Sequence, residues 1–180
     1  MLIAQITDTH IKLPGKLAYK KVDTAAMLER CVQELLALKP QPDLVLLTGD
    51  LVDLGRPEEY EHLKSILAPI RQRIVAIPGN HDEREAMRDA FRDGGYLPAA
   101  GKFLQFAIDD YPLRLVGLDT LIPGQGGGEL CRERLDWLDR TLAESDRPTI
   151  VAQHHPPIAA GIYYFVCQAH PTMHGTVIVR

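Results

Sequence analysis

Four short groups of polar residues contain the side-chain types that most often bind metal ions in proteins. They are Asp8-Thr9-His10, Gly49-Asp50, Gly79-Asn80-His81-Asp82 and His154-His155-Pro156-Pro157. Carboxylate and amide oxygens are hard ligands and imidazole nitrogens suit several transition metals, so a mixed set fits Mn²⁺, Fe or Zn²⁺ without selecting among them. The residue types therefore predict metal chemistry, provided that the fold brings the four groups together.

The first two groups offer ligands for a pair of cations. Asp8 and His10 are one residue apart, a spacing that in an extended chain puts both side chains on the same face, where they could bind one ion. Gly49 allows close approach of the backbone, and the two carboxylate oxygens of Asp50 can bridge two cations. Taken alone, either group is more often a turn with a capping Asp, so the prediction depends on all four groups.

The other two groups add an amide and further imidazoles. Asn80 offers a neutral oxygen ligand, and the adjacent His81 would lie near the ions without necessarily binding one. The alternative for this group is a turn with Asn in the left-handed region. Two prolines follow His154 and His155 and fix the preceding backbone in extended geometry, so that one of the two histidines can face the site.

Short apolar runs precede all four groups and predict the strands that position them. Residues 2–6, 43–48, 73–77 and 149–152 are apolar almost throughout, as expected for strands buried on both faces. Residues 104–118 form two further apolar stretches around a Tyr-Pro turn and predict a hairpin.

Amphipathic segments lie between these runs. Apolar side chains recur at helical spacing in three of them: Leu28, Val32 and Leu35; Tyr60, Leu63 and Leu67; Leu135, Leu138 and Leu142. Pro57 followed by two glutamates is a favourable helix start. Alternating strands and helices predict an α/β fold whose loops meet beyond the carboxyl ends of the strands, where ligands bind.

The composition excludes several classes of partner. A chain of 180 residues, 46% hydrophobic and 24% charged, fits a single globular domain over residues 1–180. The net charge of -4 and the scattered Lys and Arg argue against binding to duplex nucleic acid. No apolar run approaches the ~18 residues that cross a bilayer, and three cysteines without metal-type spacing indicate reduced thiols. We expect a cytoplasmic protein without a membrane partner.

In their order, the four groups resemble the signature of the calcineurin-like metallophosphoesterase superfamily, which continues with Gly-His-X-His. Within the superfamily, the chain is most similar to the branch of bacterial cyclic-nucleotide phosphodiesterases and glycerophosphodiesterases. This similarity is carried by residues 7–10, 55–60 and 154–157, and the resemblance as a whole covers residues 1–160. It implies a sandwich of mixed β-sheets flanked by helices, and an enzyme that hydrolyses a small phosphodiester with a water activated by two divalent metal ions.

The resemblance also implies a role for each candidate residue. By this resemblance, Asp8 and His10 would bind the first metal ion, Asn80 and His154 would bind the second, and Asp50 would bridge the two. His154 is preferred to His155 because the family pattern is His-X-Pro. His81 would contact the phosphate and assist the leaving group. Asp53 would orient His81 through a hydrogen bond to its ring. Leu54 replaces an arginine of the phosphoprotein phosphatases, which argues against a phosphoprotein substrate.

The expected Gly-His-X-His is not found after Pro157. His170 and His174 are the remaining candidates, and Pro171 argues against one continuous helical ligand face. We therefore expect the C-terminal part of the domain to be missing, and a fragment, a shortened natural variant and a protomer completed by its partner are the alternatives. Apolar residues 158–166 favour a homo-oligomeric interface. A phosphomonoesterase with the same ions and an inactive scaffold domain are the alternative functions.

Overall fold

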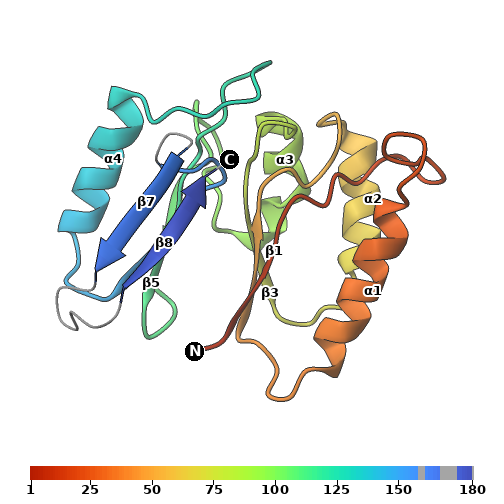
Figure 1. Cartoon of the computed structure of the whole chain (residues 1–180), viewed down its shortest axis with the longest axis horizontal. Coiled ribbons are helices and arrows are strands. Elements are labelled where there is room, and N and C mark those ends of the chain that lie inside the picture. The colour runs from red at the N-terminus through yellow and green to blue at the C-terminus, as the bar shows by residue number, and fades with distance from the viewer. Residues whose placement is uncertain (158–160, 167–173, 180) are drawn as a thin grey trace.

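The computed structural model describes residues 1–157, 161–166 and 174–179, the last two ranges as backbone only. The strands lie in the middle of the molecule, with helices α1 and α2 on one side and α4 on the other (Figure 1). Within these ranges, the strands form two three-stranded sheets, in the orders β1-β2-β3 and β4-β5-β6, and one two-stranded sheet. The predicted α/β architecture of mixed sheets flanked by helices is confirmed.

The first sheet is parallel and contains three of the predicted strands. β1 (Ile3–Ile6) and β3 (Arg73–Ile77) pair with β2 (Leu44–Thr48) on either side. The central strand β2 is buried at every position, whereas only the last residue of β1 is buried. Burial on both faces is thus correct for β2 and wrong for β1. It is also wrong for the strand at residues 149–152, where Ile150 and Val151 are 39% and 41% exposed.

Helices α1 (Thr24–Ala37) and α2 (Pro57–Leu67) connect these strands. The side chain of Asp23 caps α1 by accepting a hydrogen bond of 2.9 Å from the N–H of Ala26. Both predicted apolar faces are confirmed, because Leu28, Val32 and Leu35 of α1 and Tyr60, Leu63 and Leu67 of α2 are buried.

The second sheet contains the predicted hairpin and the last predicted strand. β4 (Phe106–Ile108) pairs antiparallel with β5 (Arg114–Gly117), which pairs parallel with β6 (Thr149–Ala152). Along the chain, α3 (Arg84–Ala90) and the short helix η1 (Arg92–Gly94) come between β3 and β4. Helix α4 (Arg132–Ala143) comes between β5 and β6. β7 (Gly161–Val166) and β8 (His174–Val179) pair antiparallel.

Close contacts join the two three-stranded sheets. A Cβ at Gly117 of β5 would lie 2.3 Å from the ring of Phe106 and 2.8 Å from Ile77 of β3, so glycine lets the sheets approach. The ring of Tyr96 packs edge-to-face on Phe106 with centroids 4.8 Å apart, and its hydroxyl accepts a hydrogen bond of 2.9 Å from Ala76 of β3.

The α4 helix is present as predicted, but its leucine stripe does not face the core. Leu135 and Leu142 are 45% and 40% exposed, and the buried residues of α4 are Arg134 and Thr141. Arg134 donates hydrogen bonds of 3.1 and 3.2 Å to the carbonyls of Asp119 and Leu121. These polar contacts, which periodicity does not encode, set the orientation of α4. Among the residues described here, no helix is both long and apolar enough to span a membrane.

Candidate metal centre

The loops that leave β1 and β2 are hydrogen-bonded to each other, and this places the first two groups together. The N–H of Asp8 donates to the carbonyl of Gly49 (3.1 Å), that of His10 to Asp50 (3.0 Å) and that of Ile11 to Leu51 (3.0 Å). The parallel pairing of the two strands therefore continues into their loops. As a result, ligand atoms of Asp8, His10 and Asp50 all lie within 4.8 Å of one another.

Three of the candidate ligands have left-handed backbone conformations. Asp8, His10 and Asp50 have φ of 54°, 40° and 50°, and Gly49 has φ of 92°. The extended geometry assumed for Asp8 and His10 is therefore wrong, although both side chains do reach the same place. Positive φ is uncommon outside glycine, and it persists where surrounding hydrogen bonds enforce it, often at functional sites.

The carboxylate of Asp50 lies between two imidazoles. Nε2 of His10 is 3.6 Å from Oδ2, and Nε2 of His154 is 3.5 Å from Oδ1. The N–H of His81 also donates to Oδ1 at 2.9 Å. Asp50 is buried at this position. Each carboxylate oxygen is thus paired with a different candidate ligand, the arrangement expected of a bridging group.

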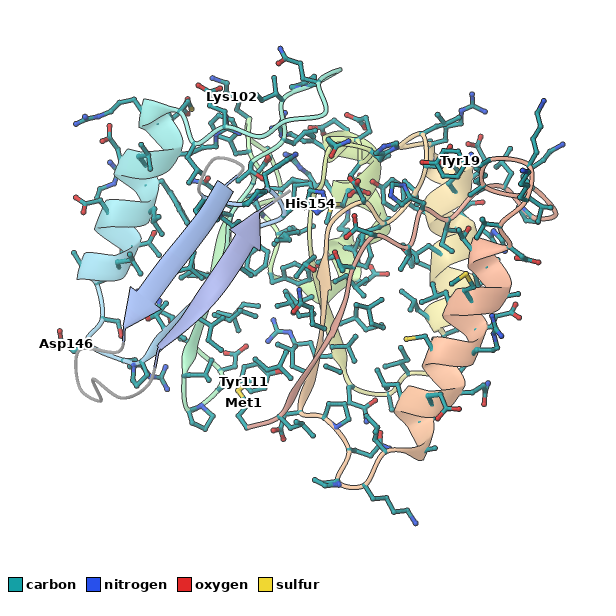
Figure 2. The ribbon with its side chains drawn as sticks, in the orientation of Figure 1. Met1, Tyr19, Lys102, Tyr111, Asp146 and His154 are labelled. Atoms are coloured by element: carbon teal, nitrogen blue, oxygen red, sulfur yellow. The ribbon has the colours of Figure 1, made fainter. Side chains whose placement is uncertain are left out.

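The structure distinguishes the two adjacent histidines. Nδ1 of His154 donates to the carbonyl of Thr48 at 2.8 Å, which directs Nε2 to Asp50. A metal-bound histidine commonly has its other ring nitrogen fixed in this way. His155 turns to Thr120, with Nδ1 2.7 Å from the hydroxyl. In Figure 2, His154 lies between the side of the molecule that carries α4 and the side that carries α1 and α2.

The charges at Asp50 and His154 suit a cation site. Burial favours a higher pKa for Asp50, but the hydrogen bonds from His154 and the His81 N–H outweigh it and lower the pKa to about 2. Burial likewise favours a lower pKa for His154, but contact with Asp50 and the hydrogen bond to Thr48 raise it to about 9. A bound cation would take the place of the proton on His154 Nε2.

The third group reaches the site because Gly79 has no side chain. A Cβ there would lie 2.3 Å from Oδ1 of Asp50 and 2.9 Å from Nε2 of His154. Asn80 follows directly and is half-buried. It lines a cleft of about 380 Å³ together with His81, Arg84 and Leu121. This cleft opens beside the third group and offers room for a small ligand.

Asp53 contacts His81 through a different atom from the one expected. Nδ1 of His81 is 2.7 Å from the main-chain carbonyl of Asp53, while the Asp53 carboxylate pairs with Lys12. The ring of His81 is exposed and packs edge-to-face on His10, with centroids 4.6 Å apart. No motif marks Lys12 in the sequence, because its partner is 41 residues away.

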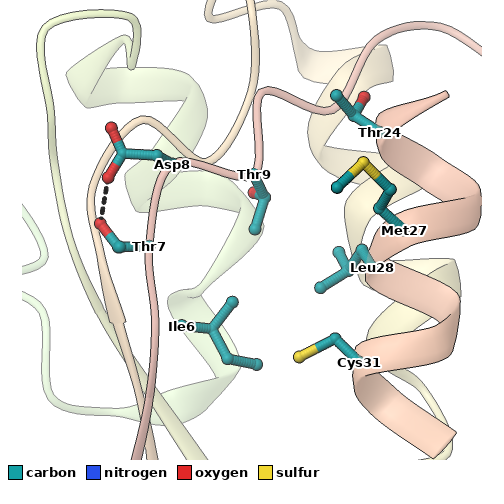
Figure 3. A pocket seen from close by; sticks show the side chains of 8 residues that line it. All are labelled: Ile6, Thr7, Asp8, Thr9, Thr24, Met27, Leu28 and Cys31. Carbon is teal, nitrogen blue, oxygen red and sulfur yellow. Dashed lines mark hydrogen bonds between the residues drawn. The ribbon is translucent and has the colours of Figure 1, made fainter. Parts of the chain in front are cut away.

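A second cleft lies behind the loop that carries Asp8. It has a volume of about 210 Å³ and is lined by Ile6, Met27, Leu28 and Cys31, among others. Figure 3 shows that Thr9 and Ile6 point towards α1, whereas the carboxylate of Asp8 points to the opposite side, where it accepts a hydrogen bond of 2.5 Å from Thr7. Asp8 is among the residues that line this apolar cleft, but its carboxylate faces away from α1.

Some predicted features lie outside what the structure describes. His170 and residues 158–160 are outside the described residues, and the side chains of His174 and of residues 161–166 are too. The expectation of a C-terminal ligand pair and that of an apolar interface at residues 158–166 therefore stay predictions.

The chain is similar to several known proteins. A family model described as calcineurin-like phosphoesterase matches residues 1–171. The probable glycerophosphodiester phosphodiesterase GpdQ of Arcobacter nitrofigilis is 40% identical over 169 residues, which are 93% of this chain and 62% of that protein. The 3',5'-cyclic adenosine monophosphate phosphodiesterase CpdA of Escherichia coli K12 is 34% identical over 160 residues, 88% of this chain and 56% of that protein.

The chain thus spans less than two thirds of the length of these relatives. Among solved structures, purple acid phosphatase PPD1 from yellow lupin seeds superimposes with a TM-score of 0.54 at 14% identity, over 83% of this chain and 29% of that one. This likeness concerns the fold.

Proposed function

We propose, since the chain belongs to the calcineurin-like phosphoesterase family, that it hydrolyses phosphodiester bonds with the help of two divalent cations. Membership of this family implies a dinuclear metal site, and the residues present fit one. The observation that carries the proposal is the Asp50 carboxylate, which has Nε2 of His10 on one oxygen and Nε2 of His154 on the other.

Five residues would hold the ions. In this proposal, Asp8 and His10 would hold one ion, Asn80 and His154 would hold the other, and Asp50 would contact both. When bound, two such cations lower the pKa of a water molecule and neutralise the phosphate oxygens, which favours in-line attack on phosphorus. Their identity among Mn²⁺, Fe and Zn²⁺ is not selected by this mixture of oxygen and nitrogen ligands.

In this proposal, His81 assists the leaving group. Its Nδ1 donates to the carbonyl of Asp53, so a proton given to a substrate oxygen would come from Nε2. The exposure of the ring and its contact with His10 keep it at the rim of the site. His81 would then protonate the departing alkoxide while Asp53 holds the orientation of the ring.

The substrate class follows from the relatives and from the size of the cleft. The relatives are named for glycerophosphodiesters and for 3',5'-cyclic adenosine monophosphate, and we propose a small diester of one of these two kinds. The cleft of about 380 Å³ beside Asn80 and His81 would receive the part of the substrate that carries the leaving oxygen.

Replacement of Asp50 tests the mechanism. We expect Asp50→Ala to lose bound metal and to slow hydrolysis of bis(p-nitrophenyl) phosphate by at least about 100-fold, because the bridging charge is removed. Asp136→Ala, on the exposed side of α4, serves as the control and should retain both properties. A metal-free Asp50→Ala protein that hydrolysed the diester at the wild-type rate would refute the mechanism. Hydrolysis of p-nitrophenyl phosphate in place of the diester would indicate a phosphomonoesterase.

A further inference from the structure

A buried pair of polar side chains, Tyr60 and Asp82, lies beneath the candidate metal centre. Tyr60 is 1% exposed and Asp82 is 5% exposed. The hydroxyl of Tyr60 donates to Oδ1 of Asp82 at 2.8 Å. Tyr60 belongs to α2, outside the four groups of candidate ligands, and its spacing with Leu63 and Leu67 indicates only a core residue. A buried hydroxyl needs a partner, and here the partner is a carboxylate.

Asp82 connects the loops that carry two of the candidate ligands. Its Oδ2 accepts hydrogen bonds from the N–H of Gly79 at 2.8 Å and from the N–H of Leu51 at 3.3 Å. Leu51 directly follows Asp50, and Gly79 directly precedes Asn80. One carboxylate oxygen therefore sets the separation between the loop of the bridging residue and the loop of Asn80 and His81.

Tyr60 fixes the position of that carboxylate. Its hydroxyl donates to Asp82 and accepts a hydrogen bond of 3.3 Å from the N–H of Glu83, so it holds both the side chain and the end of the turn. Burial raises the pKa of Tyr60 far above its usual range, so the hydroxyl stays a donor at physiological pH. The ring is fixed among the buried residues of α2, which makes it a rigid support.

We propose that Tyr60 is a positioning residue for the metal centre: through Asp82 it fixes the spacing between the loops of Asp50 and Asn80. This inference rests on the proposed function, because it assumes that these loops bind cations. Residues that orient metal ligands from behind commonly change metal affinity by about 10- to 100-fold when they are replaced.

Tyr60→Phe tests the inference, with Tyr96→Phe as its matched control. Both tyrosines are buried and both hydroxyls bond a backbone N–H, but the partner of Tyr96 is Ala76, within β3 and outside the loops that carry the candidate ligands. We expect both variants to melt a few degrees below the wild type. Only Tyr60→Phe should weaken Mn²⁺ binding, by about tenfold or more in calorimetric titration.

The spectrum of bound Mn²⁺ gives a second readout that a purely structural role would not change. Below the melting temperature, electron paramagnetic resonance of Tyr60→Phe should show less of the coupled signal of paired ions than the wild type and Tyr96→Phe show. Should Tyr60→Phe fail to fold, Asp82→Asn, which keeps the side-chain shape, replaces it in the same measurements. Equal Mn²⁺ affinity in all three proteins, or equal weakening in both variants, would overturn the inference while leaving the proposed function intact. A wild-type protein that bound none of Mn²⁺, Fe²⁺ and Zn²⁺ would overturn both.

Discussion

At the scale of single residues, the site depends on conformations that most side chains avoid. Asp8, His10 and Asp50 all have positive φ, and backbone hydrogen bonds between the two loops hold them there. Such backbone conformations cost about 1–3 kcal/mol each. The fold therefore holds the ligands in place at some expense of stability, which is typical of a site that must be in position before its ion binds.

Gly79 is the residue at which this crowding is most easily tested. In Gly79→Ala, the new Cβ would lie 2.3 Å from Oδ1 of Asp50 and 2.4 Å from its backbone nitrogen, both of which are rigidly held. We expect a loss of about 1–3 kcal/mol in the free energy of unfolding, together with weaker Mn²⁺ binding. Urea unfolding and calorimetric titration measure the two effects.

Gly126→Ala is the control, because a Cβ there meets nothing within 4 Å. It should match the wild type in Mn²⁺ affinity. Wild-type Mn²⁺ affinity in Gly79→Ala would contradict the close approach of the Asp50 and Gly79 loops.

At the scale of elements, a buried carboxylate joins three segments of the chain. Asp119 follows β5 and is fully buried, and it accepts hydrogen bonds from Arg84 Nε (2.7 Å), the N–H of Leu104 (2.9 Å) and the N–H of Leu121 (3.0 Å). Arg134 of α4 donates hydrogen bonds to the main-chain carbonyls of Asp119 and Leu121. Asp119 therefore positions the segment, including Leu121, that lines the cleft beside Asn80 and His81.

Asp119→Asn should consequently be strongly destabilising. Replacing one partner of a buried ion pair costs about 3–5 kcal/mol, because the remaining charge of Arg84 loses its counter-ion. Asp89→Asn is the control: Asp89 pairs with Arg92, but its side chain is 66% exposed, so the change should cost about 0–1 kcal/mol. Equal unfolding free energies for the two variants would show that Asp119 does not hold these elements together.

The elements differ in how far the sequence predicts them. The faces of α1 and α2 could be predicted, because the spacing of Leu28, Val32 and Leu35 directly records which side of a helix is buried. The orientation of α4 could not be, since it depends on the contact of Arg134 with a turn 13 to 15 residues away. Likewise, spacing marks Tyr60 as a core residue but does not show that its hydroxyl meets Asp82.

The candidate site was predictable in its residues and less so in its atoms. The ligand types and their positions after strands indicated metal chemistry, and resemblance to a family selected His154. The contact of His81 with the carbonyl of Asp53, in place of its carboxylate, depends on Lys12, which takes the carboxylate. Such competition for a partner is a tertiary property that a motif does not record.

At the scale of the whole molecule, the site lies where the two sheets meet. Asp8, Asp50 and Asn80 follow strands of the first sheet, and His154 follows β6 of the second. The hydrogen bond from His154 to Thr48 of β2 joins the two sheets at this edge. The candidate metal centre is therefore built by the packing of the sheets, as well as by the loops of either one.

Crystals grown with Mn²⁺ and measured for anomalous scattering test the central claim, that Asp50 bridges two cations. We predict two anomalous peaks about 3.5–4 Å apart, one contacted by Asp8 and His10, the other by Asn80 and His154, with one oxygen of Asp50 on each. The claim would be contradicted if neither peak lay in contact with Asp50, or if His155 bound an ion in place of His154.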